Sequence, residues 1–129
     1  MEQRALKGIA RTAWGLAGAF LLIAATAASN PTLLFLTTTA ECSCTLDRCT
    51  VGRQEIDKFL RAVPAKCSLQ VIDVSKVPEA TKTYRTLVLP TAILRGPTGI
   101  QIARFDGFFT EADLLGAWTR HLSAKEKKP

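Results

Sequence analysis

The sequence has a single histidine, a single methionine and only four cysteines among its 129 residues. Four cysteines are too few for a small domain in which disulfides replace a hydrophobic core. The net charge of +6 comes without any basic stripe interleaved with aromatic side chains, which argues against nucleic acid as a partner. Apolar residues make up 47% of the chain and charged residues 22%, so we expect one compact domain rather than a disordered tail or a multispan membrane protein.

Residues 12–29 carry no charge and follow three basic residues, Arg4, Lys7 and Arg11. As a helix this stretch would span about 27 Å, just enough to cross the core of a bilayer. Basic residues stay on the cytoplasmic side, so the pattern predicts export of everything that follows. The stretch equally fits a cleaved signal peptide, with Ala25-Thr26-Ala27 at the cleavage site. We expect residues 1–29 to be a signal peptide or a single transmembrane anchor, which would make the membrane a partner. The domain would then be extracytoplasmic, in a periplasm or at a cell surface.

Apolar periodicity predicts four strands and three helices in the rest of the chain. Short apolar, β-branched runs indicate strands at residues 32–39, 69–74, 87–94 and 100–105. Apolar residues at helical spacing indicate a helix that ends at Pro64, a second over residues 110–122, and a weak one at 78–84 between them. The first two strands are joined by a helix and should be parallel, whereas the last two form a hairpin. The expected fold class is α/β, a β-α-β-α-β-β-α three-layer sandwich around a mixed four-stranded sheet. It covers residues 30–123, between an N-terminal hydrophobic helix and a basic tail at 124–129.

Three local features accompany this order of elements. The first strand runs into a cysteine cluster and then a helix, a proline opens the hairpin strand in Val88-Leu89-Pro90-Thr91, and Gly107 separates the last strand from a capped helix. On these features residues 32–122 resemble the thioredoxin family, which keeps a cis-proline facing its active site and uses the backbone beside it to pair with an incoming peptide. The resemblance implies a thioredoxin fold and assigns substrate binding to Leu89 and Pro90. Without the resemblance, Pro90 would be read as a strand-edge proline. The family's tryptophan, its C-x-x-C spacing and its opening strand and helix are absent.

The chain has the spacing Cys42-x-Cys44-x4-Cys49 instead, and two pairings are open. Projecting the helical stripe backward places Cys49 in the first helical turn, facing the sheet, where the family has its resolving cysteine. Cys44 would then be the attacking thiol in an enlarged loop. The alternative pairs Cys42 with Cys44, whose disulfide closes a tight, strained ring and is easily reduced. Both pairings place the three sulfur atoms together beside Pro90. Cys67 precedes the second strand, at the opposite end of the sheet, and should not pair with this cluster.

Thiol–disulfide exchange needs a thiolate and a second thiol nearby, so Cys42, Cys44 and Cys49 are the candidate catalytic residues of an exported thiol–disulfide oxidoreductase. It would act on protein or small-molecule disulfides, use no cofactor, and exchange electrons with a donor or acceptor that the sequence does not identify. Two other hypotheses remain open. A non-catalytic module would bind a partner through the Pro90 edge, with the cysteines as a static clip or, for Cys49, a small buried side chain. A soft-metal protein would bind Cu(I) or Zn through three thiolates, although no histidine or methionine lies near them.

Overall fold

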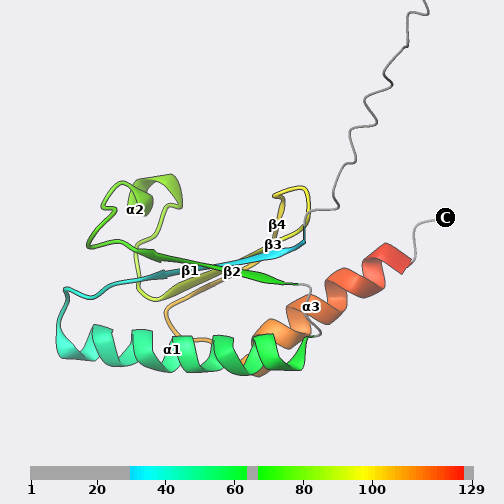
Figure 1. Ribbon diagram of the computed structural model, residues 1–129, viewed down its shortest axis with the longest axis horizontal. Helices are drawn as coiled ribbons and strands as arrows, with labels where there is room; N and C mark the ends of the chain where they lie inside the picture. The colour runs from blue at the N-terminus through cyan, green and yellow to red at the C-terminus, as the bar shows by residue number, and fades with distance from the viewer. Residues whose placement is uncertain (1–29, 64–66, 127–129) are drawn as a thin grey trace, which may run out of the picture.

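The computed structural model describes residues 30–63 and 67–126, so the predicted signal peptide or anchor at 1–29 lies outside the described residues. The described residues form, in order, β1 (Thr32–Thr37), α1 (Ser43–Ala62), β2 (Ser68–Asp73), α2 (Ala80–Thr83), β3 (Thr91–Arg95), β4 (Gln101–Asp106) and α3 (Glu111–Glu126) (Figure 1). This order confirms the predicted β-α-β-α-β-β-α arrangement. None of these helices is both long and apolar enough to cross a membrane.

The strands form one mixed sheet in the order β2-β1-β3-β4. Strand β1 runs parallel to β2, with Thr32 opposite Ser68, and antiparallel to β3, with Leu36 opposite Thr91. Strands β3 and β4 form the expected antiparallel hairpin. Helices α1 and α3 cover one face of the sheet and the short α2 lies on the other face (Figure 1). The predicted three-layer sandwich with a mixed four-stranded sheet is therefore confirmed.

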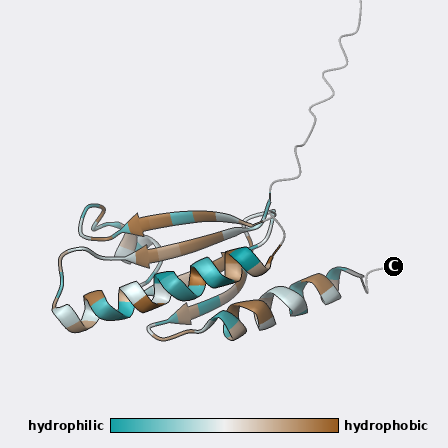
Figure 2. Ribbon diagram, turned by 60° about the horizontal axis from the view of Figure 1, so that its bottom comes forward, coloured by the Kyte–Doolittle hydropathy of each residue, from teal (hydrophilic) through white to brown (hydrophobic). Residues whose placement is uncertain are grey.

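Strand β1 lies at the centre of the core. Its Leu33 and Phe35 pack in the cluster shared with α1 and α3, whereas Leu34 and Leu36 pack in the cluster that includes α2. This division follows from the alternation of side chains along a strand. All four side chains are at most 2% exposed. Figure 2 shows the same contrast over the whole domain, with strands that are hydrophobic over much of their length and many hydrophilic residues along α1.

Strand β2 is an edge strand, although its apolar sequence is typical of a strand that is buried on both faces. Val71, in the middle of β2, is 44% exposed. Apolar composition alone cannot distinguish the two cases, because burial depends on whether another strand pairs with the outer edge. Within residues 30–63 and 67–126 no strand does so.

Helix α1 begins at Ser43, so Cys44 lies in the helix and not in the enlarged loop that the first pairing required. Cys42 is the N-cap residue, and its carbonyl accepts hydrogen bonds from the N–H groups of Thr45 (3.0 Å) and Leu46 (3.1 Å). The buried positions of α1 are Cys49, Gly52, Ile56 and Phe59. The hydrophobic stripe therefore starts only in the second turn. The first turn is exposed and lacks apolar residues at helical spacing, so its sequence does not indicate that it belongs to the helix.

Helix α3 begins with the predicted cap. The Thr110 hydroxyl accepts a hydrogen bond from the Asp113 N–H (3.3 Å), and the Asp113 carboxylate accepts one from the Thr110 N–H (2.9 Å). This is the reciprocal pattern of a capping box. The Glu55 carboxylate of α1 also accepts a hydrogen bond from the Glu111 N–H (2.7 Å), which ties the two helices together. The helix continues to Glu126, into the expected basic tail.

Gly52 allows α1 to approach the chain before β3 and after β4. A Cβ at this position would lie 3.0 Å from Cγ of Pro90 and 3.2 Å from Cζ of Phe109.

We expect Gly52→Ala to lower the free energy of unfolding by about 1 kcal/mol, because overpacking costs ~1–3 kcal/mol and outweighs the ~0.5–1 kcal/mol that alanine gains over glycine in a helix. Urea denaturation measures the change. The matched control is Gly116→Ala on α3, whose Cβ would meet the flexible end of Arg120 at 3.4 Å and should be stabilising. Equal gains in stability for both variants would contradict this packing.

Candidate functional site

The expected cis-proline is present, because the peptide bond between Leu89 and Pro90 is cis. Pro90 is fully buried and lies directly before β3, whose first residue, Thr91, is opposite Leu36 of β1. The end of β1 that leads to the cysteines therefore lies beside this proline. The loop that contains the proline and the start of α1 thus share one edge of the sheet.

Cys42 and Cys44 form a close thiol pair at the N-terminus of α1. Their Sγ atoms are 2.6 Å apart, and both residues are exposed free thiols. The structure therefore brings together the second of the two pairings considered from the sequence. The N-terminal end of a helix carries a partial positive charge, so this is a favourable place for a thiolate.

The surroundings of Cys42 favour its ionised form. The Cys44 thiol, and after it the Thr45 hydroxyl at 3.3 Å, form hydrogen bonds with the Cys42 sulfur and lower the pKa of Cys42 to about 7. The N–H groups of Thr45 and Cys44 act in the same direction. A large fraction of Cys42 is therefore thiolate at neutral pH, whereas an ordinary cysteine stays mostly protonated.

Cys49 lies apart from this pair. It is 6% exposed and occupies the second turn of α1 rather than the predicted first turn. Five helical positions separate it from Cys44, about 7.5 Å along the axis, which exceeds the ~7 Å between Cα atoms that a disulfide can bridge. The predicted gathering of three sulfur atoms is therefore wrong, although Cys49 does face the sheet as expected. Its side chain lines a hollow of about 510 Å³ between α1, the end of β1 and Val71 of β2.

Cys67 precedes β2, at the opposite end of the sheet, and is a free thiol as predicted. Burial raises the pKa of Cys67 to about 11, against a smaller opposing effect of a hydrogen bond with the Leu33 backbone. This thiol stays protonated at neutral pH and is a poor nucleophile.

A groove of about 360 Å³ separates the start of α1 from the cis-proline loop. It is lined by Glu41, Thr45 and Arg48 on the α1 side and by Leu87, Val88 and Leu89 on the loop side. The Leu87 side chain is 97% exposed. The groove therefore has an apolar wall on one side and a polar wall that continues into the thiol pair on the other.

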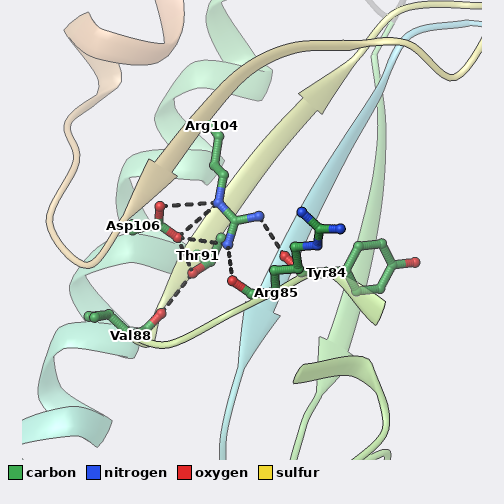
Figure 3. A network of polar contacts seen from close by, with 6 residues as sticks. All are labelled: Tyr84, Arg85, Val88, Thr91, Arg104 and Asp106. Atoms are coloured by element: carbon green, nitrogen blue, oxygen red, sulfur yellow. Dashed lines mark hydrogen bonds and ion pairs between the residues drawn. The ribbon is translucent and has the colours of Figure 1, made fainter. Parts of the chain in front are cut away.

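A network of polar contacts centred on Arg104 of β4 holds the cis-proline loop (Figure 3). The guanidinium donates hydrogen bonds to the carbonyls of Tyr84 and Arg85 and forms an ion pair with Asp106 at 3.0 Å. The Asp106 carboxylate also accepts a hydrogen bond from the Thr91 hydroxyl (3.0 Å). The guanidinium holds the pKa of Asp106 below its ordinary value, so the ion pair persists to a lower pH than an isolated aspartate would allow.

Two further contacts fix the proline itself. The Thr91 hydroxyl lies 2.7 Å from the Val88 carbonyl, and the Gly107 N–H donates to the Pro90 carbonyl at 2.7 Å. Gly107 has φ 82°, where a side chain is strained, and a Cβ there would lie 3.3 Å from Val88. Sequence reasoning used Gly107 only as the end of a strand and did not find Thr91, Arg104 or Asp106. Arg104 and Asp106 are two residues apart in β4 and therefore lie on the same face of the strand. This spacing of opposite charges is the sequence feature from which their ion pair could have been predicted.

Asp73, the last residue of β2, holds the segment that leads from β1 to the thiol pair. Its carboxylate accepts hydrogen bonds from the hydroxyls of Ser75 (2.6 Å) and Thr39 (2.7 Å) and from the Ser75 N–H (3.0 Å). These bonds, led by the Ser75 hydroxyl, lower the pKa of Asp73 to about 2. Thr39 lies shortly before Cys42, so the carboxylate ties the start of α1 to the sheet.

The three-thiolate metal site considered from the sequence is not assembled. No three metal-ligating side chains gather within the part of the chain that the structure describes. Cys49 is in the second turn of α1 and the other two thiols are at its start, which accounts for this result.

The tie at Asp73 predicts a pH dependence of stability. The folded state holds the pKa of Asp73 near 2, below an unfolded value of about 4, so its ionised form stabilises the fold above that value and the contribution is lost as pH falls through about 2. Thermal unfolding measures stability at each pH. At pH 7, Asp73→Asn should be less stable than the unmodified protein, and between pH 7 and pH 2 it should lose less stability. Asp57→Asn, which breaks an exposed ion pair with Arg53 on α1, is the control. Parallel curves for Asp73→Asn and the unmodified protein would contradict the tie.

The fold has counterparts among solved structures, although neither a scan against protein-family models nor a search of curated proteins gives a match. A malarial protein is 24% identical, with a TM-score of 0.63, over 73% of this chain and 99% of that chain. Thioredoxin-2, described as a component of malaria parasite protein secretion machinery, is 24% identical, with a TM-score of 0.62, over 71% of this chain and 84% of that chain. Thioredoxin 1 from the thermophilic eubacterium Thermosipho africanus is 20% identical, with a TM-score of 0.60, over 74% of this chain and 99% of that chain. Together with the strand order and the cis-proline, these similarities show that the chain has the thioredoxin fold.

Proposed function

We propose that the chain is a thiol–disulfide oxidoreductase in which Cys42 is the attacking thiolate and Cys44 the resolving thiol. The observation that carries the proposal is the 2.6 Å contact between the two sulfur atoms, both exposed at the N-terminus of α1. A lowered thiol pKa and a second thiol within reach are the two requirements of thiol–disulfide exchange. The thioredoxin fold supports this chemistry, since it places the pair beside the cis-proline loop.

The reaction proceeds in two exchanges. The Cys42 thiolate attacks one sulfur of a substrate disulfide, a bond forms between the two sulfur atoms, and the other substrate sulfur leaves as a thiolate that takes a proton from solvent. The Cys44 thiol then loses its proton and attacks the Cys42 sulfur, which releases the second substrate thiolate. The substrate disulfide gains two electrons and two protons, and the pair becomes a disulfide. A dithiol donor regenerates the pair, and a disulfide acceptor drives the same steps in reverse.

Thr45 positions the hydrogen bond that stabilises the Cys42 thiolate. Its hydroxyl oxygen accepts a hydrogen bond from the Arg48 guanidinium (3.4 Å), so its own proton is free to point at the Cys42 sulfur. A donor that is itself hydrogen bonded to a cation is polarised and becomes a stronger donor. Besides the neighbouring Cys44, the ionisable groups that line the groove on this side are Glu41 and Arg48.

Protein disulfides fit the groove better than small molecules. The exposed apolar side chains of Leu87 and Val88 flank it, and such an edge suits the side chains of an extended polypeptide. The backbone at Leu89 and Pro90 would pair with that segment, as the resemblance implies. No cofactor takes part in the exchange.

Export to an extracytoplasmic compartment, periplasmic or at a cell surface, is part of the same proposal. It is supported by the uncharged stretch at 12–29 and the basic residues before it. In an oxidising compartment a thiol pair of this kind would act on disulfides that form there.

Reduction of insulin disulfides by the full chain, in the presence of a dithiol, tests the proposal. Cys42→Ser should abolish activity, because it removes the exposed thiol whose pKa is lowered to about 7. Cys44→Ser should trap a mixed disulfide on Cys42 that mass spectrometry detects. Cys67→Ser is the matched control and should keep full activity. Activity that survives in Cys42→Ser, or that depends on Cys49 but not on Cys44, would contradict the assignment.

Thr45→Val should raise the pKa of Cys42 above about 7, because the second-largest stabilising contact is lost. The rate of Cys42 alkylation by iodoacetamide as a function of pH reports this change as a shift of its midpoint to higher pH. Thr45→Ser keeps the hydroxyl and should restore the profile. Thr50→Val, the same substitution at an exposed site farther along α1, should leave it unchanged. An unshifted profile in Thr45→Val would remove Thr45 from this role.

A further inference from the structure

We propose that the end of the domain opposite the thiol pair rests on the surface of an anionic phospholipid membrane. The proposal depends on the expectation that residues 12–29 enter the bilayer, and it is independent of the redox assignment. Three observations carry it: where the described chain begins, the apolar side chains exposed at that end, and the basic side chains that lie beside them.

The described chain begins at the end of the domain that lies farthest from Cys42 and Cys44. Thr32, the first residue of β1, is opposite Arg95, the last residue of β3. The β3–β4 turn follows Arg95 and is closed by hydrogen bonds between Gly96 and Ile100 (2.8 Å) and between Gly99 and Gly96 (2.9 Å). Figure 1 shows the start of β1, this turn and the carboxyl end of α3 at the same end of the domain.

The link between the uncharged stretch and the domain is short. Only Asn30 and Pro31 separate residues 12–29 from the first residue of β1. Two extended residues span at most about 7 Å. If the stretch is inserted, this end of the domain is held against the lipid headgroups whatever angle the domain adopts.

Apolar side chains are exposed at this end without a protein partner in the described structure. Ile100, at the end of the β3–β4 turn, is 71% exposed, and Leu122 on the last turns of α3 is 44% exposed. Between the turn and α3 lies a hollow of about 460 Å³, lined in part by Ile100, Ile102, His121 and Lys125. An exposed apolar tip with a lysine beside it is the pattern of a surface that inserts shallowly at an interface, because the apolar group enters the acyl boundary and the ammonium stays among the headgroups.

Basic side chains lie at this end of the domain. Arg61 closes the last turn of α1 and Lys125 the last turn of α3. The sequence adds Lys127 and Lys128 directly after. Basic residues next to a membrane segment are attracted to anionic lipids. The opposite end, around the thiol pair, is of mixed charge: the carboxylates of Glu41, Asp47, Asp73 and Asp106 lie there together with the basic side chains of Arg48, Lys76 and Arg104.

This orientation has a consequence for the thiol pair. Helix α1 has 20 residues and runs from the thiol end to the membrane end (Figure 1), a length of about 30 Å. With the axis of α1 perpendicular to the membrane, Cys42 and Cys44 would stand about 30 Å from the headgroups, and the groove would be open to soluble proteins.

Photo-crosslinking of the full chain in vesicles of phosphatidylcholine and phosphatidylglycerol tests the orientation. The photoreactive residue p-benzoylphenylalanine is placed at Ile100 and, as a matched control, at Leu87, which is exposed at the thiol end. A third variant carries it at Phe20, within the uncharged stretch. We expect lipid adducts at positions 20 and 100, with a yield at 100 several-fold above that at 87. In the Ile100 variant, adding Lys125→Glu should lower the yield in these vesicles but not in pure phosphatidylcholine.

Four results would overturn the proposal. Lipid adducts at 20 with none at 100 would leave the anchor but remove the contact, and none at 20 would remove the anchor as well. Equal yields at 100 and 87 would mean that the domain has no fixed orientation. Adducts at 100 with a second copy of the chain would show that this surface binds protein rather than lipid. None of these results affects the insulin assay, so the two proposals fail separately.

Discussion

The position of β1 between two other strands fixes where the remaining parts of the molecule lie. Its four central side chains are buried on both faces, and both of its edges are hydrogen bonded, to β2 in parallel and to β3 in antiparallel register. A shift by one residue would move Leu33 and Phe35 from one core cluster to the other, so this register is strongly specified. The end of β1 therefore meets the chain before β3, and the start of α1 must lie beside Pro90. The opposite end of β1 meets the β3–β4 turn for the same reason, which separates the thiol pair from the first residues of β1 by the length of the domain.

At the thiol end the chain meets the requirements of exchange chemistry without the C-x-x-C spacing of the family that it resembles. The N-cap position of Cys42 gives it access to solvent and to the N–H groups of the first turn. Cys44, two positions later, supplies both the hydrogen bond and the second thiol. Thr45, at the third position after Cys42, contributes a hydroxyl that Arg48 polarises. The loop across the groove is held by Arg104 and Asp106, so both walls of the site are fixed by contacts of their own.

The order of elements could be predicted from the sequence, because the strands and the long helices have periodic apolar patterns. The helix between β1 and β2 predicts a parallel pair, and the short turn between β3 and β4 predicts an antiparallel one. The sequence was also sufficient for the cis-proline, through the resemblance, and for the cap at Thr110 and Asp113. The start of α1 could not be predicted, because its first turn is exposed and has no apolar stripe. That error moved Cys49 into the first turn and placed three sulfur atoms together. The contacts of Arg104 with Tyr84 and Arg85 could not be predicted either, since they join residues far apart in sequence.

The central claim is that Cys42 and Cys44, rather than any pair that includes Cys49, are the exchanging thiols. The most direct measurement is the connectivity of the disulfide that forms when the reduced full chain is treated with a mild thiol oxidant. It is read by mass spectrometry after digestion under acidic conditions that prevent reshuffling. The account predicts a single intramolecular disulfide between Cys42 and Cys44, with Cys49 and Cys67 recovered as free thiols. A disulfide that joins Cys49 to either residue, or a Cys42 and Cys44 that both remain reduced, would contradict it.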